Sequence, residues 1–343
     1  MGADNVRAQA RPSLPGVLFA LAGLLLFFWA LRQTGLTVVT DGIGRLGVGF
    51  LFILLLAGAR FWVRAVAWVL ATEPPERLRS SEAFRALVAG DTLGNLTPLG
   101  LVLSETTKAA YVRPGLSLMA AIAGIAIENL IYTLTVALVI ASGTMALLLE
   151  FNPTGTLRTL AIVALSLVAT GFVAITVVLT SRIGAATRTA SWLKARGWLP
   201  DRLGRHVAQL AALEDQVCGF AARYPNRMYA IFGLDLAFHA LGVLEVWLTL
   251  AWLLPAAAPT LVNTFILESV NRTIMVVFKF VPLRLGVDEV GTELLTRLLG
   301  LPLGIGVIMA VIRKARMVVW SAVGVAFLLR RGLQTRTMPP NRS

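Results

Sequence analysis

The sequence predicts an all-α polytopic membrane protein with about six full spans and two re-entrant helical hairpins, arranged as an inverted repeat. Three observations lead to this fold class: long apolar runs recur along the chain, two further apolar segments are broken by proline and glycine, and positive charge gathers between the runs. Of the 343 residues 57% are hydrophobic and 14% are charged, and the mean hydropathy is +0.77. A soluble protein of this length needs more charged surface.

Six apolar runs are long enough to be spans. They lie at about 14–31, 46–70, 116–149, 157–180, 228–254 and 303–329. Each approaches or exceeds the roughly 20 residues that a helix needs to cross the hydrocarbon core. The first run follows Arg7 and Arg11 and ends without a small-residue cleavage site. We therefore interpret it as an uncleaved first span rather than a signal peptide.

Positive charge sets the predicted orientation. The loop at 181–227 is rich in Arg and Lys, whereas the connections near 150–157 and 255–260 carry few or none. This places the loop, the N-terminus and the C-terminal tail in the cytoplasm, in a multi-pass protein of the cell (inner) membrane. We assign the net charge of +13 to contacts with anionic lipid headgroups rather than to nucleic acid.

The two interrupted segments, 83–112 and 261–299, complete this topology. Six full spans return the chain to the side where it began, so each interrupted segment has to enter and leave on one face. The first follows a cytoplasmic loop and the second follows an external one. We therefore expect re-entrant hairpins inserted from opposite sides.

A single integral membrane domain is expected over 1–343. It has a first half to about 180, a cytoplasmic amphipathic loop at 181–227, a second half at about 228–332 and a basic tail at 333–343. One helical stripe in the loop is apolar and consists of Val207, Leu210, Leu213, Val217 and Phe220. It predicts an amphipathic helix that lies either on the inner leaflet or on the protein itself.

Spacing suggests that the two halves are related. Pro98 precedes Glu105 by seven residues, and Pro282 precedes Glu289 by seven. A glycine turn and a long apolar run follow in both cases. Because the hairpins are expected to enter from opposite sides, the repeat is inverted. Inverted repeats with broken helices near the midplane are typical of transporters, where protein or a wet cavity satisfies the irregular backbone.

Several charges fall inside apolar segments, where they are costly unless paired or hydrated. Glu128 and Arg313 occupy equivalent places in the two halves. We expect them either to line a central polar cavity that holds a lipid headgroup or to form a structural ion pair between the repeats. Glu268 and Arg272 predict a satisfied i,i+4 pair that faces protein.

Two other pairs leave alternatives open. Glu105 and Lys108 share a helix face. They contact a phosphate and its counter-charge, or they form a local pair at the hairpin mouth. Asp235 and His239 form either a structural pair or a proton relay.

Two motifs carry a resemblance to a known family. The first, "NLTPLGLVLSETTKAAYVR", contains Asn95, Pro98, Glu105 and Lys108, and the second, "FVPLRLGVDEVG", contains Pro282, Gly286 and Glu289. The last span continues with "VIRKARMVVW". These motifs resemble those of the integral-membrane region of lysylphosphatidylglycerol synthases and their stand-alone, flippase-like relatives. Two departures from the family pattern are "IENLIY", which keeps only the Glu of a Glu-Arg pair, and the absence of glycines at 103–104.

The resemblance, together with the buried charges, leads to one set of candidate substrate-binding residues. It comprises Asn95, Pro98, Glu105, Lys108, Glu128, Pro282, Gly286, Glu289 and Arg313.

The predicted function is that of a lipid translocase, which moves a phospholipid or an isoprenoid-type lipid across the cytoplasmic membrane. The alternatives are a membrane-embedded enzyme or accessory subunit in lipid, hopanoid or glycolipid synthesis, and a scaffold for a partner enzyme. The chain leaves no room for the soluble aminoacyl-transfer domain of full synthases, so lysyl transfer is not expected. One cysteine and two histidines predict no metal site and no cofactor. The expected partners are membrane lipids and lipid-biosynthesis enzymes.

Overall fold

The computed structural model describes residues 37, 44–96, 100–112, 115–181, 184–196, 198, 207–256, 259–278, 281 and 284–337. Within these ranges the regular structure is entirely helical. The expected all-α fold is therefore confirmed for the described residues. The predicted span at 14–31 lies outside them, as do Pro98 and Pro282.

Four helices are long and apolar enough to cross a membrane. They are α3 (Gly49–Ala71), α6 (Leu118–Phe151), α7 (Gly155–Ser181) and α11 (Pro225–Leu253). They coincide with the predicted runs 46–70, 116–149, 157–180 and 228–254. A fifth long helix, α14 (Ile305–Thr337), covers the predicted run 303–329 but carries Arg313, Lys314 and Arg316 in its first half.

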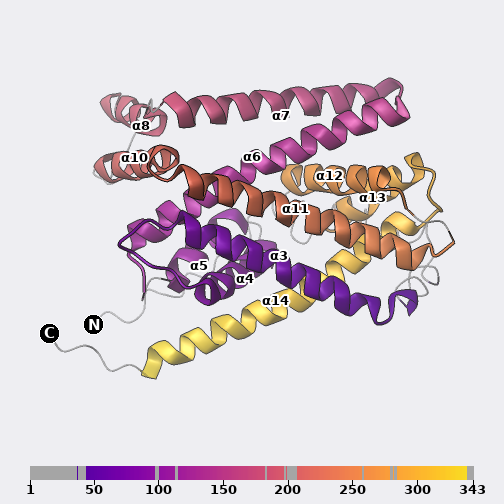
Figure 1. The fold of residues 1–343 in the computed structure, drawn as a ribbon, viewed down its shortest axis with the longest axis horizontal. Helices are drawn as coiled ribbons and strands as arrows, with labels where there is room; N and C mark the ends of the chain where they lie inside the picture. The colour runs from indigo at the N-terminus through magenta and orange to yellow at the C-terminus, as the bar shows by residue number, and fades with distance from the viewer. Residues whose placement is uncertain are drawn as a thin grey trace.

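Two pairs of short helices occupy the interrupted segments. The first helix pair is α4 (Ser80–Leu96) with α5 (Gly100–Val112), and the second is α12 (Leu261–Val277) with α13 (Val287–Leu298). At 12 to 17 residues each, these helices are about 18–26 Å long, shorter than a hydrocarbon core of about 30 Å. In Figure 1 the first pair lies toward the left, and the second lies toward the right.

Local signals explain where the helices of the second pair begin. The Thr260 hydroxyl accepts a hydrogen bond from the Asn263 backbone N–H at 3.1 Å and caps α12. Gly286 precedes α13 with a φ of +81°, a backbone conformation that favours glycine. The Glu289 carboxylate accepts a bond from the Gly286 N–H at 2.8 Å. The glycine and glutamate of the second motif therefore form the start of α13.

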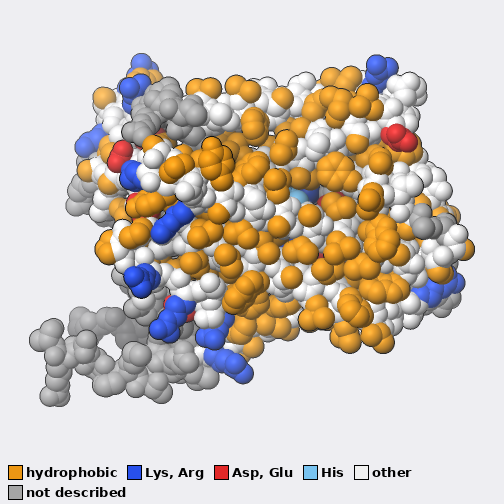
Figure 2. All heavy atoms as spheres, in the orientation of Figure 1, with side chains coloured by type: hydrophobic (Ala, Val, Ile, Leu, Met, Phe, Trp, Pro, Cys, Tyr) orange, Lys and Arg blue, Asp and Glu red, His pale blue; other side chains and the backbone are white. Residues whose placement is uncertain are grey.

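The helices pack as a bundle with one peripheral member. Helix α3 packs along α11, α4 contacts α14, and α6 contacts α12. Helix α7 packs mainly on α6 at the upper edge of Figure 1, and most of its side chains are exposed. An apolar helix with an open face is expected where lipid is the solvent. In Figure 2 hydrophobic side chains cover the middle of the visible face, while Lys and Arg gather toward its ends.

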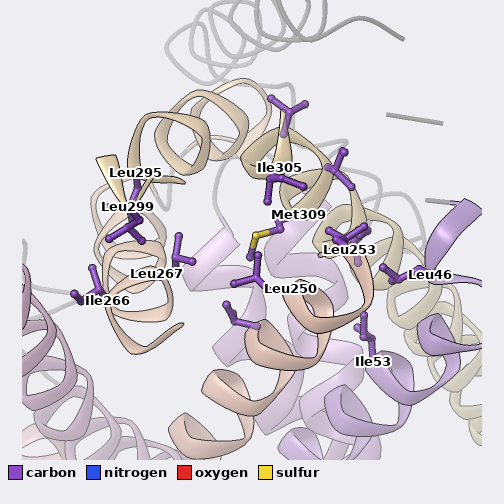
Figure 3. Close-up of a cluster of buried hydrophobic side chains, with 14 of the residues drawn as sticks. Leu46, Ile53, Leu250, Leu253, Ile266, Leu267, Leu295, Leu299, Ile305 and Met309 are labelled. Carbon is purple, nitrogen blue, oxygen red and sulfur yellow. The ribbon is translucent and has the colours of Figure 1, made fainter. Parts of the chain in front are cut away.

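A buried apolar cluster joins the two halves of the chain. Ile53 of α3, Leu250 of α11, Ile266 of α12, Leu295 of α13 and Met309 of α14 all belong to it (Figure 3). A separate cluster around Trp68 packs α3 on the first helix pair and on α6. The first of these clusters, which also includes Leu147 of α6, fixes the second helix pair against four long helices, α3, α6, α11 and α14.

The predicted amphipathic helix is present as α10 (Val207–Arg223). Its C-terminal end packs on the protein, because Phe220 is buried in a cluster with Ile127 of α6 and Ile231 of α11. Near its middle, the Glu214 carboxylate accepts bonds from the backbone N–H and the hydroxyl of Thr187 at 2.9 and 2.6 Å. Those bonds attach α10 to α8 (Ala185–Ala195).

Candidate functional site

A cavity of about 150 Å³ lies where the ends of the two helix pairs approach each other. Asp91 and Asn95, at the end of α4, line it from the first half. Arg284 and Asp288, at the start of α13, line it from the second half. The end of α4 and the start of α13 therefore line the same cavity, although the two pairs lie toward opposite ends of the bundle (Figure 1).

Positive side chains dominate the lining of this cavity. Its described carboxylates are Asp91 and Asp288, and its cations come from α3, α12, α14 and the turn before α13. The cations are Arg60, Arg64, Arg272, Arg284, Arg313, Lys314 and Arg316. Guanidinium groups are always charged and present planar sets of donors that match carboxylates and phosphates.

The α3 arginines are held by acids on the long helices. Arg64 donates two hydrogen bonds to Glu128 of α6, at 2.7 and 2.8 Å. Arg60 donates to Glu245 of α11 at 2.9 Å, and Arg316 of α14 pairs with the same carboxylate. These bonds fix both arginines at the cavity wall.

The α12 arginine is paired on its own helix. Arg272 donates to Glu268 at 2.5 Å, and both side chains are almost fully buried. The predicted i,i+4 pair is therefore confirmed. Arg272 also lines the cavity, which the sequence did not indicate.

The turn of the second helix pair is neutralised from α14. Lys314 Nζ lies 2.5 Å from Glu289 and 3.8 Å from Asp288, and Arg284 lies 3.6 Å from Asp288. Glu289 is fully buried. Because its other oxygen caps α13, Glu289 holds the turn in place and does not line the cavity.

Arg313 differs from the other cavity cations. Its guanidinium donates to the Thr292 hydroxyl at 2.6 Å, and its Nε is buried without a hydrogen-bond partner. Within the described part of the chain it forms no ion pair with a carboxylate, in contrast to Arg60, Arg64 and Arg272. It therefore retains the most capacity for an anion in the cavity.

The structure divides the candidate residues into three groups. Asn95 and Arg313 line the cavity, and Asn95 donates to Asp91 at 2.8 Å. Glu128, Gly286 and Glu289 lie behind the lining and position it. Pro98 and Pro282 lie outside the described residues.

The remaining two candidates, Glu105 and Lys108, form an ion pair of 2.9 Å with each other. Lys108 is buried beside Gly90 of α4, and neither residue lines the cavity. Of the two alternatives, this geometry matches a local pair. Glu128 and Arg313 are likewise not partners of one another, since Glu128 binds Arg64 and Arg313 binds Thr292.

Sequence reasoning missed the α3 arginines. Arg60 and Arg64 are four residues apart inside an apolar run, which is the same signal that identified Glu128. Tyr132 is the last residue of the "IENLIY" segment, and the Arg64 guanidinium lies over its ring, 4.1 Å from the ring centroid. Among the described residues, no group of three His, Cys, Asp or Glu side chains is arranged to hold a metal ion.

A sequence model of the family described as "Lysylphosphatidylglycerol synthase TM region" matches residues 14–324. The chain belongs to this family. Comparison with curated proteins found no match, and neither did comparison with solved structures. The resemblance read from the two motifs is confirmed. In this lysylphosphatidylglycerol synthase TM-region protein, the whole cavity lies inside the matched range.

Proposed function

We propose that the protein is a lipid translocase of the cytoplasmic membrane, which moves a phospholipid or an isoprenoid-type lipid phosphate. The headgroup passes through the cavity while the tails remain in the bilayer. The observation that carries this proposal is the cationic cavity lined by helices of both helix pairs, which belong to different halves of the chain.

The chemistry of the lining favours a phosphate. Moving a charged headgroup through hydrocarbon is costly because its hydration is lost. Donors from Arg313 and Arg284 would replace part of that hydration, since a hydrogen bond to a charged group contributes about 1.5–3 kcal/mol. Asp91 and the neutral amides of Asn95 and Asn271 offer acceptors and donors to a glycerol or sugar hydroxyl.

Helix contacts support an inverted repeat of α3–α6 with α11–α14. A two-fold relation that exchanges these sets maps α4 onto α12 and α14 onto α6. It therefore maps the contact between α4 and α14 onto the contact between α12 and α6, and both contacts are present. Each has a glycine against a small hydroxyl residue: Gly324 faces Thr92, and Gly143 faces Ser269.

The charges across this relation have reversed signs. In the first half an arginine of α3, Arg64, binds a glutamate of α6, Glu128. In the second half a glutamate of α11, Glu245, binds an arginine of α14, Arg316. Opposite charges in related places give a cavity wall in which Arg64 and Arg316 each have an acid behind them.

The arrangement also supports re-entrant hairpins that open to opposite sides. The first helix pair lies at the same end of Figure 1 as α8, α10 and the C-terminal end of α14. That end contains the basic loop, which the positive-inside rule places in the cytoplasm. The second helix pair lies toward the other end. Termini in the cytoplasm and a hairpin from each face follow from this orientation.

Lipid movement in vesicles tests the proposal. Purified protein is reconstituted with phosphatidylglycerol that carries a fluorescent label, and the fraction quenched by external dithionite is followed. We expect wild type to raise that fraction. Arg313→Gln should lose about 2 kcal/mol of headgroup binding, which lowers the affinity for the headgroup by a factor of about 30. Arg297→Gln, on the half-exposed face of α13, is the matched control and should move lipid at the wild-type rate.

Two outcomes would contradict translocation. The first is a quenched fraction equal to that of protein-free vesicles with unchanged lipid. The second is chemical conversion of the lipid without movement, which would favour the membrane-embedded enzyme.

A further inference from the structure

One buried carboxylate beside the cavity has no visible structural use. Asp235 of α11 is fully buried, and neither of its oxygens has a hydrogen-bond partner among the described residues. His239 lies one turn further along and is also buried. Its Nε2 is 3.3 Å from the Thr135 hydroxyl of α6, and its Nδ1 is unpartnered within the same ranges.

This pair lies one layer behind the cavity. The Tyr132 ring stacks on His239 with centroids 5.6 Å apart and planes 13° apart, and the Arg64 guanidinium lies over Tyr132. Both Tyr132 and Arg64 line the cavity. A change of charge at Asp235 is therefore close enough to be felt at the cavity wall.

Ionisable groups surround Asp235 and His239 on every helix packed against them. They are Arg60 and Arg64 of α3, Glu128 and Tyr132 of α6, and Glu268 and Arg272 of α12. Each of the charged groups among these has a partner described above. Arg64 already binds Glu128 through both of its oxygens. Asp235 is thus a second carboxylate near the Arg64 guanidinium, which already donates hydrogen bonds to Glu128.

We propose that Asp235 is a proton-binding site that couples proton movement to passage of an anionic headgroup. The inference rests on the proposed function and adds its energy source. A buried carboxylate without a donor is costly while it is charged, and a proton removes that cost. Water in the cavity supplies the proton, and His239, with its unpartnered Nδ1, relays it across the Tyr132 layer.

The sign of the coupling follows from the charges. Protonation of Asp235 removes one negative charge beside Arg64, so the cavity attracts phosphate more strongly. By linkage, a phosphate in the cavity favours protonation of Asp235 to the same extent. The proton and the lipid anion therefore move in the same direction. For a phosphodiester with one negative charge, the transported pair is neutral.

Calorimetry tests the coupling without transport. Dihexanoyl phosphatidylglycerol is titrated into the purified protein in two buffers that differ in ionisation enthalpy. We expect wild type to take up as much as one proton per lipid bound, and Asp235→Asn to bind lipid without proton uptake. Asp215→Asn, at an exposed position on α10, is the matched control and should behave as wild type.

The outcomes separate the two proposals. Lipid binding by wild type without proton uptake, or uptake that persists in Asp235→Asn, overturns the coupling and leaves translocation standing. If wild type does not bind the lipid, the headgroup site itself is contradicted, and the proposed coupling is contradicted as well.

A pH gradient across vesicles gives the second test. With an acidic interior, wild type should collect labelled phosphatidylglycerol in the outer leaflet, by up to about tenfold per pH unit for one proton per lipid. Asp235→Asn should distribute the lipid equally with or without the gradient, and its lipid binding in the calorimetric titration shows that the variant is folded. A wild-type distribution that ignores the gradient would rule out coupling.

Discussion

Single residues around the cavity have two different tasks. Arg60, Arg64 and Arg272 are bound to buried acids, so most of their charge is already neutralised. The hydrogen-bond partner of Arg313 among the described residues is the Thr292 hydroxyl, and no carboxylate there forms an ion pair with it. We therefore assign a positioning role to the paired arginines and direct headgroup contact to Arg313.

Removal of Glu128 should be a stability defect first. Glu128→Gln leaves the Arg64 charge without its carboxylate in a buried place, which costs about 3–5 kcal/mol. Thermal unfolding in detergent measures the loss, and Arg64→Gln combined with Glu128→Gln should recover part of it. Arg297→Gln removes a half-exposed partner of Glu293 and should cost less than about 1 kcal/mol. Equal stability of Glu128→Gln and wild type would contradict this assignment.

At this scale the sequence identified charges but not their partners. Glu128 and Arg313 were recognisable because a charge inside an apolar run is costly. Their actual partners depend on how the helices are rotated and placed, since Arg64 is 64 residues from Glu128. Glu268 and Arg272 were paired correctly because both lie on one helix, where spacing alone brings them together.

Among the helices, close contacts at glycine hold the two halves together. The Gly143 position of α6 leaves no room for a side chain beside Ser269 of α12, and Gly324 of α14 has the same relation to Thr92 of α4. Small residues let membrane helices approach closely, so that packing and weak polar contacts replace the missing hydrophobic drive.

A larger side chain at the contact between Gly143 and Ser269 should separate α6 from α12. Gly143→Val is expected to destabilise the protein by about 1–3 kcal/mol through overpacking, and to reduce lipid movement because α12 carries Arg272. Gly171→Val on α7, where nothing lies within 4 Å, is the control with the same substitution. Unfolding temperatures of the two variants in one detergent make the comparison. A loss at Gly171 as large as at Gly143 would show that the contact is unimportant.

The sequence predicted that each interrupted segment is broken into shorter helices, but it did not predict which side chains of those helices face inward. Breaks at 95–100 and 282–286 marked where each apolar segment turns. Hydropathy could not show that Glu105 and Lys108 face the α4–α5 contact while Asn95 faces the cavity, because this depends on the rotation of each helix. The predicted basic tail at 333–343 begins inside α14, which continues to Thr337.

At the scale of the whole molecule, the inverted repeat and the orientation in the membrane lead to one prediction. The connection before α4 should be cytoplasmic, and the connection after α11 should be external. In a Cys218→Ser background, cysteine at exposed position Arg77 and cysteine at exposed position Ala256 should react with an impermeant maleimide from opposite sides of sealed vesicles. Reaction of both from the same side would contradict the topology. This orientation is a prediction from the charge bias of the sequence, whereas the cavity became visible only in the packed bundle.

The central claim is that one cavity serves both faces of the membrane, and Asn95 reports on it directly. Asn95→Cys in the Cys218→Ser background places a thiol at the cavity wall. The account predicts that an impermeant maleimide modifies this thiol when it is added from either side in separate experiments, and that phosphatidylglycerol slows both reactions. Modification from one side alone, or none from either, would contradict a headgroup path through this cavity.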